Sequence, residues 1–390
     1  MTNREYNSLM KKYGHLNLKI ALMLVATMTI MSGVTVVASL PLMSETFSDI
    51  ENIDFLSKLM LSIPSLVIAV FAPIIGLLSD KTGRLKPLYL GVLLFVLGGS
   101  SGFYLDDFFS ILVGRAVLGL GVAMIMTSST ALIGDYFKEH ERHAYLSIQG
   151  MAVGIGGIIF ITSGGFLAEL HWSYPFAIYF LPLLFLPVLF ISLYEPKEHL
   201  LVDEEVHVDA NRLWPIFLTA FSAMVLFYML PTQLPYLVIN ELNGTPASVG
   251  ILISVAMSIN ALTSMNYARI KKRLSYAHIF MVTFIVFGIG LTILSQAENI
   301  AQLYFSVFFM GIGFGLVLTN INAWFLSIVS VKQRGKAAGI LASSFFLGQF
   351  CSPLLFEPIV QSIGIQGLFL VVALGSFIVA FTIYMRKTKR

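Results

Sequence analysis

The sequence predicts an all-α polytopic membrane protein with twelve transmembrane helices in two pseudo-symmetric six-helix bundles. Hydrophobic residues make up 57% of the 390 residues, and the mean hydropathy is +0.85. Soluble domains are only roughly 45–50% apolar. Apolar runs of about 20 residues, the length that crosses a bilayer core as a helix, recur along the whole chain. The charged residues, 12% of the total, collect between these runs.

Each expected span is an apolar run that ends where charged or turn-forming residues begin again. The first run, 18–41, is longer than the core of a signal peptide and has no small-residue cleavage pattern, so we expect a retained helix. In order, the spans are expected at residues 18–41, 56–78, 88–105, 108–133, 144–168, 174–194, 213–237, 247–267, 277–295, 301–325, 337–358 and 366–385.

Basic and acidic residues alternate between successive loops. All Lys and Arg residues except Lys58 and Arg115 fall at the two termini or in every second loop. The intervening loops hold the acids Glu45, Asp49, Glu51, Asp54, Asp106, Asp107, Glu241 and Glu298. Because basic loops stay in the cytoplasm, this alternation predicts an even number of spans, two cytoplasmic termini and a place in the cell membrane.

The longest polar segment inside the chain, 195–212, divides the spans into two sets of six and reads as a solvated tether. The expected domains are a cytoplasmic N-terminus (1–17), an N-terminal bundle (18–194), a cytoplasmic linker (195–212), a C-terminal bundle (213–385) and a cytoplasmic tail (386–390).

The two halves resemble each other at an offset of 192 residues. Gly119–Ala123 in span four corresponds to Gly311–Gly315 in span ten, and Arg142 corresponds to Arg334. Such weak duplication is typical of two pseudo-symmetric bundles that enclose a site near the membrane midplane.

The densest charge cluster lies between spans two and three, in Gly-Leu-Leu-Ser-Asp-Lys-Thr-Gly-Arg-Leu-Lys-Pro-Leu at 76–88. A tight turn is expected here, with Gly83 free to adopt a positive φ. The segment resembles the loop-2/3 motif of the major facilitator superfamily, Gly-x-Leu-Ala-Asp-Arg-x-Gly-Arg-Lys-x-x-Leu. The matching residues are Gly76, Leu78, Asp80, Gly83, Arg84 and Leu88; Ser79 and Leu85 depart from the motif.

This resemblance implies the major facilitator fold and a conformational gate. Asp80 would then lie against the positive N-terminus of span eleven, and Arg84 would brace the same gate when the cytoplasmic side is closed. Arg142 and Arg334 occupy the matching loops of the two halves and would reinforce it. None of these residues is expected to touch the substrate.

Span four opens with Gly-Arg-Ala-Val-Leu-Gly-Leu-Gly at 114–121, which resembles a second motif of the family. Arg115 is the one basic residue that the span assignment leaves within the hydrocarbon. An unpaired charge there is costly, so we expect Arg115 to face a wet cavity or a partner, as a substrate or coupling residue. Alternatively, its side chain snorkels to the outer surface, since Asp106 and Asp107 lie about two turns away.

Glycines in spans four and five predict close helix packing, because small residues let helices approach and slide. The glycines concerned are Gly119, Gly121, Gly154, Gly157, Gly164 and Gly165. Span five partly resembles a motif of family exporters, but Phe160 and Ile161 stand where that motif has Gly and Pro.

The expected central cavity is lined by neutral polar and aromatic side chains. The candidates for substrate contact are Tyr228, Gln233, Asn260, Asn320 and Gln349. No acid occurs in the first span, which disfavours cationic substrates. Glu357, within Leu-Leu-Phe-Glu-Pro, is the candidate proton carrier because apolar surroundings favour a protonated carboxyl group. Glu169 and Asp54 are alternatives.

These observations favour a secondary transporter over an enzyme, since no nucleotide-binding loop or hydrolase motif occurs. The resemblance implies proton-coupled export of drug-like or lipophilic compounds. One alternative is a transporter of one metabolite, an organic anion or siderophore-like compound attracted by Arg115; another is a non-transporting membrane sensor. Expected partners are a small-molecule substrate, protons and the lipid bilayer, with no cofactor, metal or nucleic acid. We expect the protein to work as a monomer.

Overall fold

The computed structural model describes residues 3–137, 139–196, 210–329 and 334–388, and within these ranges it contains helices and short turns but no strands. The elements of the first half are α1 (Asn3–Val34), η1 (Val37–Ser39), α2 (Leu40–Thr46), α3 (Ile53–Thr82), α4 (Leu85–Gly99), α5 (Ser101–Tyr104), α6 (Phe108–Tyr136), α7 (Glu139–Leu170), η2 (Tyr174–Phe180) and α8 (Pro182–Ser192). Those of the second half are α9 (Ala210–Tyr236), the π-helical turn η3 (Leu237–Glu241), α10 (Pro246–Lys271), α11 (Tyr276–Ser295), α12 (Ile300–Ile328) and α13 (Arg334–Thr388).

These elements account for the twelve predicted spans. Some spans are composite: the first consists of α1, η1 and α2, the third of α4 and α5, and the sixth of η2 and α8. The last two spans both lie in α13, which has 55 residues and kinks at Gly364 (φ 75°, ψ 173°). Because glycine adopts a positive φ without a Cβ clash, the chain can turn back at Gly364. The helical segments before and after this residue are spans eleven and twelve.

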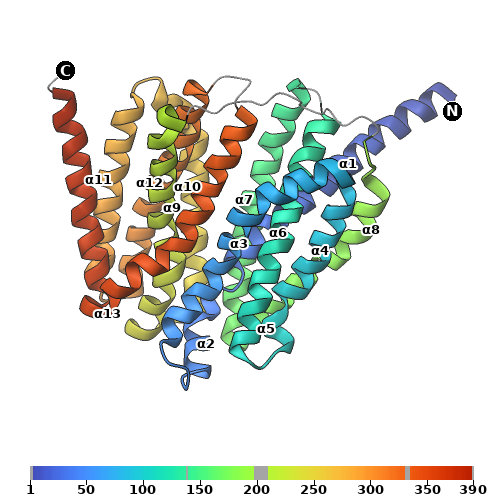
Figure 1. The fold of residues 1–390 in the computed structure, drawn as a ribbon. Coiled ribbons are helices and arrows are strands. Elements are labelled where there is room, and N and C mark those ends of the chain that lie inside the picture. The colour runs from blue at the N-terminus through green and yellow to red at the C-terminus, as the bar shows by residue number, and fades with distance from the viewer. Residues whose placement is uncertain (1–2, 138, 197–209, 330–333, 389–390) are drawn as a thin grey trace.

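The helices form two bundles side by side, with the N-terminal half at the right and the C-terminal half at the left of Figure 1. The helix α1 begins and α13 ends at the same end of the molecule, the top of the view. We call this the basic end, because Lys81 in the last turn of α3, Lys86 in the first turn of α4 and Lys272 directly after α10 lie there. The opposite end is the acidic end, with Asp49 and Glu298 in its loops.

Matching glycine contacts confirm the internal duplication. A Cβ at Gly119 would lie 2.8 Å from the backbone of α3, and one at Gly311 would lie 2.6 Å from the backbone of α10. Likewise, Gly121 packs against α4 at 2.6 Å and Gly313 against α11 at 3.1 Å. Spans four and ten therefore use equivalent glycines to pack against equivalent neighbours in the two bundles.

The domain limits remain predictions. Most of the expected linker, 195–212, lies outside the described residues, as do the side chains of Asp80 and Arg334.

Candidate functional site

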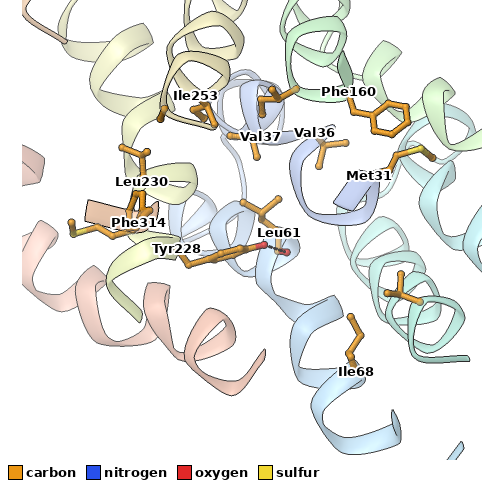
Figure 2. Packing of buried hydrophobic residues seen from close by; sticks show 14 of the residues in the cluster. Met31, Val36, Val37, Leu61, Ile68, Phe160, Tyr228, Leu230, Ile253 and Phe314 are labelled. Atoms are coloured by element: carbon orange, nitrogen blue, oxygen red, sulfur yellow. Dashed lines mark hydrogen bonds between the residues drawn. The ribbon is translucent and has the colours of Figure 1, made fainter. Parts of the chain in front are cut away.

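A cavity of about 410 Å³ lies between the two bundles. Its walls come from α1, α3, α6 and α7 of one bundle and from α9, α10, α12 and α13 of the other. Figure 2 shows residues of the two bundles close to each other here, with Leu61 and Val37 near Leu230 and Ile253. The arrangement agrees with the midplane site that the internal duplication predicts.

The lining of the cavity is mostly apolar. Its polar members are Thr29, Ser32, Ser65, Ser129, Thr130, Gln149, Tyr228, Asn260 and Gln349. Among the described residues that line the cavity, none is an aspartate, glutamate, lysine, arginine or histidine. The cavity therefore offers hydrogen bonds and apolar contact to a ligand but no opposite charge.

Three of the predicted substrate residues line this cavity. The hydroxyl group of Tyr228 in α9 donates to the Leu61 carbonyl of α3 at 3.2 Å (Figure 2). Gln349 in α13 accepts a hydrogen bond from Ser65 of α3 at 2.7 Å. Both bonds connect the two bundles. The third residue, Asn260, accepts from Ser264 one turn later in α10.

Two other candidates lie away from the lining. Asn320 accepts from the Tyr267 hydroxyl at 2.8 Å and donates to the Tyr276 carbonyl at 3.1 Å, so it connects α12 to α10 and α11. Gln233 is fully buried in α9, and neither its Oε1 nor its Nε2 atom has a hydrogen-bond partner among the described residues.

Arg115 is fully buried inside the N-terminal bundle and is not a lining residue of the cavity. Its guanidinium donates to the Ser32 carbonyl at 2.8 Å, the Met60 carbonyl at 3.3 Å and the Tyr179 hydroxyl at 3.0 Å. Ser32 is in the last turn of α1, whose terminal carbonyls lack helical partners and carry the negative end of the helix dipole. Arg115 therefore caps α1 and joins three other spans to α6.

Glu357 has a lysine partner. The Lys58 ammonium of α3 lies 2.8 Å from the Glu357 carboxylate of α13, and both side chains are buried. The Lys58 Nζ atom also lies 4.6 Å from the centre of the Tyr236 ring. The alternative carboxylates Glu169 and Asp54 are both exposed.

The hydrogen bonds that connect the two bundles lie in the middle of the molecule and towards its acidic end. Every such bond between described residues lies near the middle of the helices or towards the acidic end; the pairs are Ser44–Tyr236, Asp54–Tyr236, Lys58–Glu357, Leu61–Tyr228, Ser65–Gln349, Thr162–Ser254 and Ile158–Ser254. Towards the basic end, a Cβ added at Gly150, Gly154 or Gly339 would meet no atom within 4 Å. The bundles are therefore joined at the acidic end in this arrangement.

Three glycines of α7 contribute to this closure, whereas Gly154, also predicted to pack closely, faces open space. Gly157 faces the Met257 side chain of α10, and Gly165 lies against the α10 backbone, with a would-be Cβ 2.8 Å from the Pro246 carbonyl. Gly164 faces the Thr35 backbone, where α1 has just ended.

At the basic end, the turn at Gly83 has the expected positive φ, 91°. The Arg84 Nε atom lies 3.5 Å from the Asp135 carboxylate at the end of α6. Glu195, after α8, accepts from the backbone N–H groups of Arg84 at 2.6 Å and Leu85 at 2.9 Å. These N–H groups begin α4, where the helix dipole favours an anion.

The remaining gate candidates are placed only in part. Arg142 donates to the Gly134 carbonyl at 2.8 Å and so caps the end of α6. Gly76 packs against α6, where a Cβ would lie 3.6 Å from Thr127. The contact predicted between Asp80 and span eleven, and the gate role of Arg334, stay predictions.

Sequence reasoning assigned no role to Lys58, Asp135 or Glu195. Lys58 carried a usable signal, since it was the one basic residue at the acidic end. Glu195 belongs to a polar segment that predicts a tether, and Asp135 lies beside a basic loop, so no local pattern indicates a specific partner for either residue.

Comparisons with known proteins agree with this architecture. The family model of the Major Facilitator Superfamily matches residues 20–214 and 216–390. Quinolone resistance protein NorA of Staphylococcus aureus (strain COL) is 24% identical over 328 residues, which cover 76% of this chain and 81% of that protein. Tetracycline resistance protein, class H, of Pasteurella multocida is 25% identical over 312 residues, 74% of this chain and 75% of that protein.

Solved structures show the same fold at lower sequence identity. The D-xylose-proton symporter matches with a TM-score of 0.75 and 16% identity, over 93% of this chain and 97% of that one. A bacterial homologue of the human lysosomal transporter Spinster, inward-facing and occupied, also has a TM-score of 0.75 and 16% identity, over 95% and 96% of the two chains. Because the family model spans nearly the whole sequence, this chain belongs to the Major Facilitator Superfamily and is a secondary transporter.

Proposed function

We propose that this protein exports neutral, lipophilic, drug-like molecules across the cell membrane, in exchange for protons. The observation that carries the proposal is the cavity of about 410 Å³ with no acidic or basic side chain among its described lining residues. A charged substrate would lose its hydration there without gaining a counter-ion, which is costly in an apolar site. A neutral apolar substrate gains contact area and loses little hydration.

The charges near the cavity argue against the organic-anion alternative. That alternative depends on Arg115, whose guanidinium is already bonded to two backbone carbonyls and a tyrosine hydroxyl. Attracting an anion would require Arg115 to leave the end of α1. The names of the relatives NorA and tetracycline resistance protein, class H, which refer to drug resistance, support the export of drug-like compounds.

The direction of access follows from the charge pattern and the inter-bundle contacts. If the basic end faces the cytoplasm, as the distribution of Lys and Arg favours, the closed acidic end faces outwards. The protein is then in an inward-facing arrangement, ready to load substrate from the cytoplasm or inner leaflet. A proton gradient supplies the driving force in this proposal, because the sequence has no nucleotide-binding loop.

Dye efflux from bacteria that lack their major drug pumps tests the proposal. Cells expressing the protein should expel the neutral dye Nile red, and nigericin, which collapses the pH gradient, should stop this efflux. Val153→Trp should abolish efflux because Val153 lines the cavity and the indole would fill it. Ile191→Trp is the matched control, since Ile191 is 82% exposed on the outer surface of α8.

The opposite outcome is equally clear. If the protein expels no neutral dye and confers no drug resistance, but a deletion strain accumulates one organic anion, the metabolite alternative replaces the proposal. Failure of dye counterflow in vesicles with every compound tested would favour a non-transporting sensor.

A further inference from the structure

We propose that Lys58 and Glu357 form a proton-released lock between the two bundles at the acidic end. In the closed arrangement the ionised pair holds the bundles together, and a proton that binds Glu357 from the acidic side releases them. The inference rests on the proposed function only in taking the bundles to separate at this end during transport.

The geometry of the pair is that of a lock. Lys58 lies in α3 of the N-terminal bundle and Glu357 in α13 of the C-terminal bundle, with 2.8 Å between the Nζ and Oε2 atoms. The side chains are only 2% and 8% exposed. Breaking a buried ion pair by neutralising one partner is strongly unfavourable, because it leaves the other charge buried without compensation. The state of Glu357 therefore decides whether the closed arrangement is favourable.

The surroundings of the pair hold it in place without competing for its charges. Tyr236 of α9 places its ring 4.6 Å from the Lys58 ammonium, in cation–π contact. The Tyr236 hydroxyl shares a hydrogen bond of 3.0 Å with Ser44 of α2 and donates to the Asp54 carbonyl at 3.3 Å. These contacts also connect the bundles, but they are neutral and do not respond to protons in the same way.

Two other titratable residues lie near the pair among the described residues: Tyr236, whose ring contacts Lys58, and Asp54, whose backbone carbonyl accepts from the Tyr236 hydroxyl. Asp54 is exposed and lies one helical turn before Lys58 in α3. An acid four residues ahead of a lysine is a favourable spacing for an ion pair within one helix. When Glu357 becomes neutral, Lys58 can therefore turn from Glu357 to Asp54 as the bundles part.

This exchange gives the lock a direction. The proton binds the Glu357 carboxylate, Lys58 keeps its own charge, and the separated arrangement provides Asp54 as the new partner. A proton that binds the separated arrangement better than the closed one shifts the population towards separation. Acidification of the side that the acidic end faces should therefore open that end.

Spin-label distances across the acidic end test the lock directly. The single cysteine is first removed as Cys351→Ser, and labels are attached to Asp106→Cys and Glu298→Cys, which replace exposed residues in the loops of different bundles. In liposomes near neutral pH, double electron–electron resonance should give one predominant short distance. Lowering the pH should transfer a large part of the population to a longer distance.

Variants of the pair separate a lock from a merely structural contact. Glu357→Gln should give the long distance at both pH values and abolish the pH response. The double swap Lys58→Glu/Glu357→Lys should restore the short distance, and Asp54→Asn should shift the population towards closure at low pH. Glu169→Gln, which changes an exposed acid, should behave as the parent protein does.

Unchanged distances and an unchanged pH response in Glu357→Gln and in Lys58→Gln would overturn the lock. The measurement needs no substrate, so it is independent of the dye assays. A pH-driven distance change in a protein that exports no neutral dye would preserve the lock and refute the proposed substrates. Dye export together with a Glu357→Gln variant whose distances and pH response match those of the parent protein would preserve the proposed substrates and refute the lock.

Discussion

Buried polar side chains at single positions show which charges the protein uses for structure and which remain available for function. Arg115 and the Lys58–Glu357 pair are all buried, yet their partners differ in kind. Arg115 bonds backbone carbonyls within one bundle, which stay in place during a rigid-body motion. Lys58 and Glu357 bond each other across the bundles, so their contact depends on the conformation.

Arg115→Gln should destabilise the protein without changing which substrates it carries. The shorter amide cannot reach the Ser32 carbonyl, the Met60 carbonyl and the Tyr179 hydroxyl together. Losing charge-assisted bonds at a helix C-terminus should cost roughly 2–4 kcal/mol. Thermal stability followed by size-exclusion chromatography measures the effect, with the exposed Lys272→Gln as the control. A stable variant with altered dye preference would instead assign Arg115 to substrate binding.

Gly83→Ala should destabilise the α3–α4 turn. Its φ is 91°, and an alanine Cβ would lie 2.9 Å from the Glu195 carboxylate that caps α4. The strain should cost roughly 1–3 kcal/mol. Gly339→Ala is the matched change in a helix, where a Cβ meets nothing within 4 Å, and it should stabilise α13 by about 1 kcal/mol. Equal thermal stability of the two variants would contradict the assigned role of the turn.

At the scale of the element, α7 lies at the boundary between the bundles. Its glycines near the acidic end allow backbone contact with α10, whereas Gly154, nearer the basic end, faces open space. In lipid, such close van der Waals contact is a main source of helix association, because the bilayer removes the hydrophobic driving force between helices. The helix therefore packs tightly where the bundles meet and loosely where they part.

Gly165→Val should weaken closure of the acidic end. A side chain there would lie 2.8 Å from the Pro246 carbonyl and close to Gly250, so α7 and α10 must separate. We expect dye efflux to fall to a small fraction of the parent rate, while Gly154→Ala keeps it. The spin-label pair across the acidic end should report the longer distance in Gly165→Val. Normal efflux and an unchanged distance would show that the contact is dispensable.

At the scale of the whole molecule, the absence of charge among the described residues of the cavity wall should determine selectivity. Asn260→Asp places an acid in the wall without adding volume, so cationic dyes should gain a counter-ion and neutral dyes should lose affinity. Efflux of ethidium relative to Nile red measures the change, and Gln296→Glu, an exposed position outside the wall, is the control. An unchanged ratio would show that Asn260 does not contact the substrate.

The fold was predictable because its main determinants are local in sequence. The length of an apolar run and the sign of the next loop are set by the thickness of the bilayer and the cost of moving a charge across it. Both features can be recognised in the sequence without knowing which residues contact each other in the fold. The repeated glycines of spans four and ten predicted the pseudo-symmetry of the two bundles, since equivalent helices in each half must pack in the same way.

The candidate site was predictable only in part. Tyr228, Asn260 and Gln349 line the cavity as expected, but Gln233 and Asn320 do not. Asn320 instead hydrogen-bonds to α10 and α11, as a polar residue in a span can do, and Gln233 is buried in α9 away from the lining. The sequence by itself determined the helices, their number and the basic and acidic loops. The tertiary structure decided the partners of Arg115 and of Glu357, whose lysine is 299 positions away. Helix rotation and bundle docking bring such residues together, and neither is encoded in a local pattern of residues.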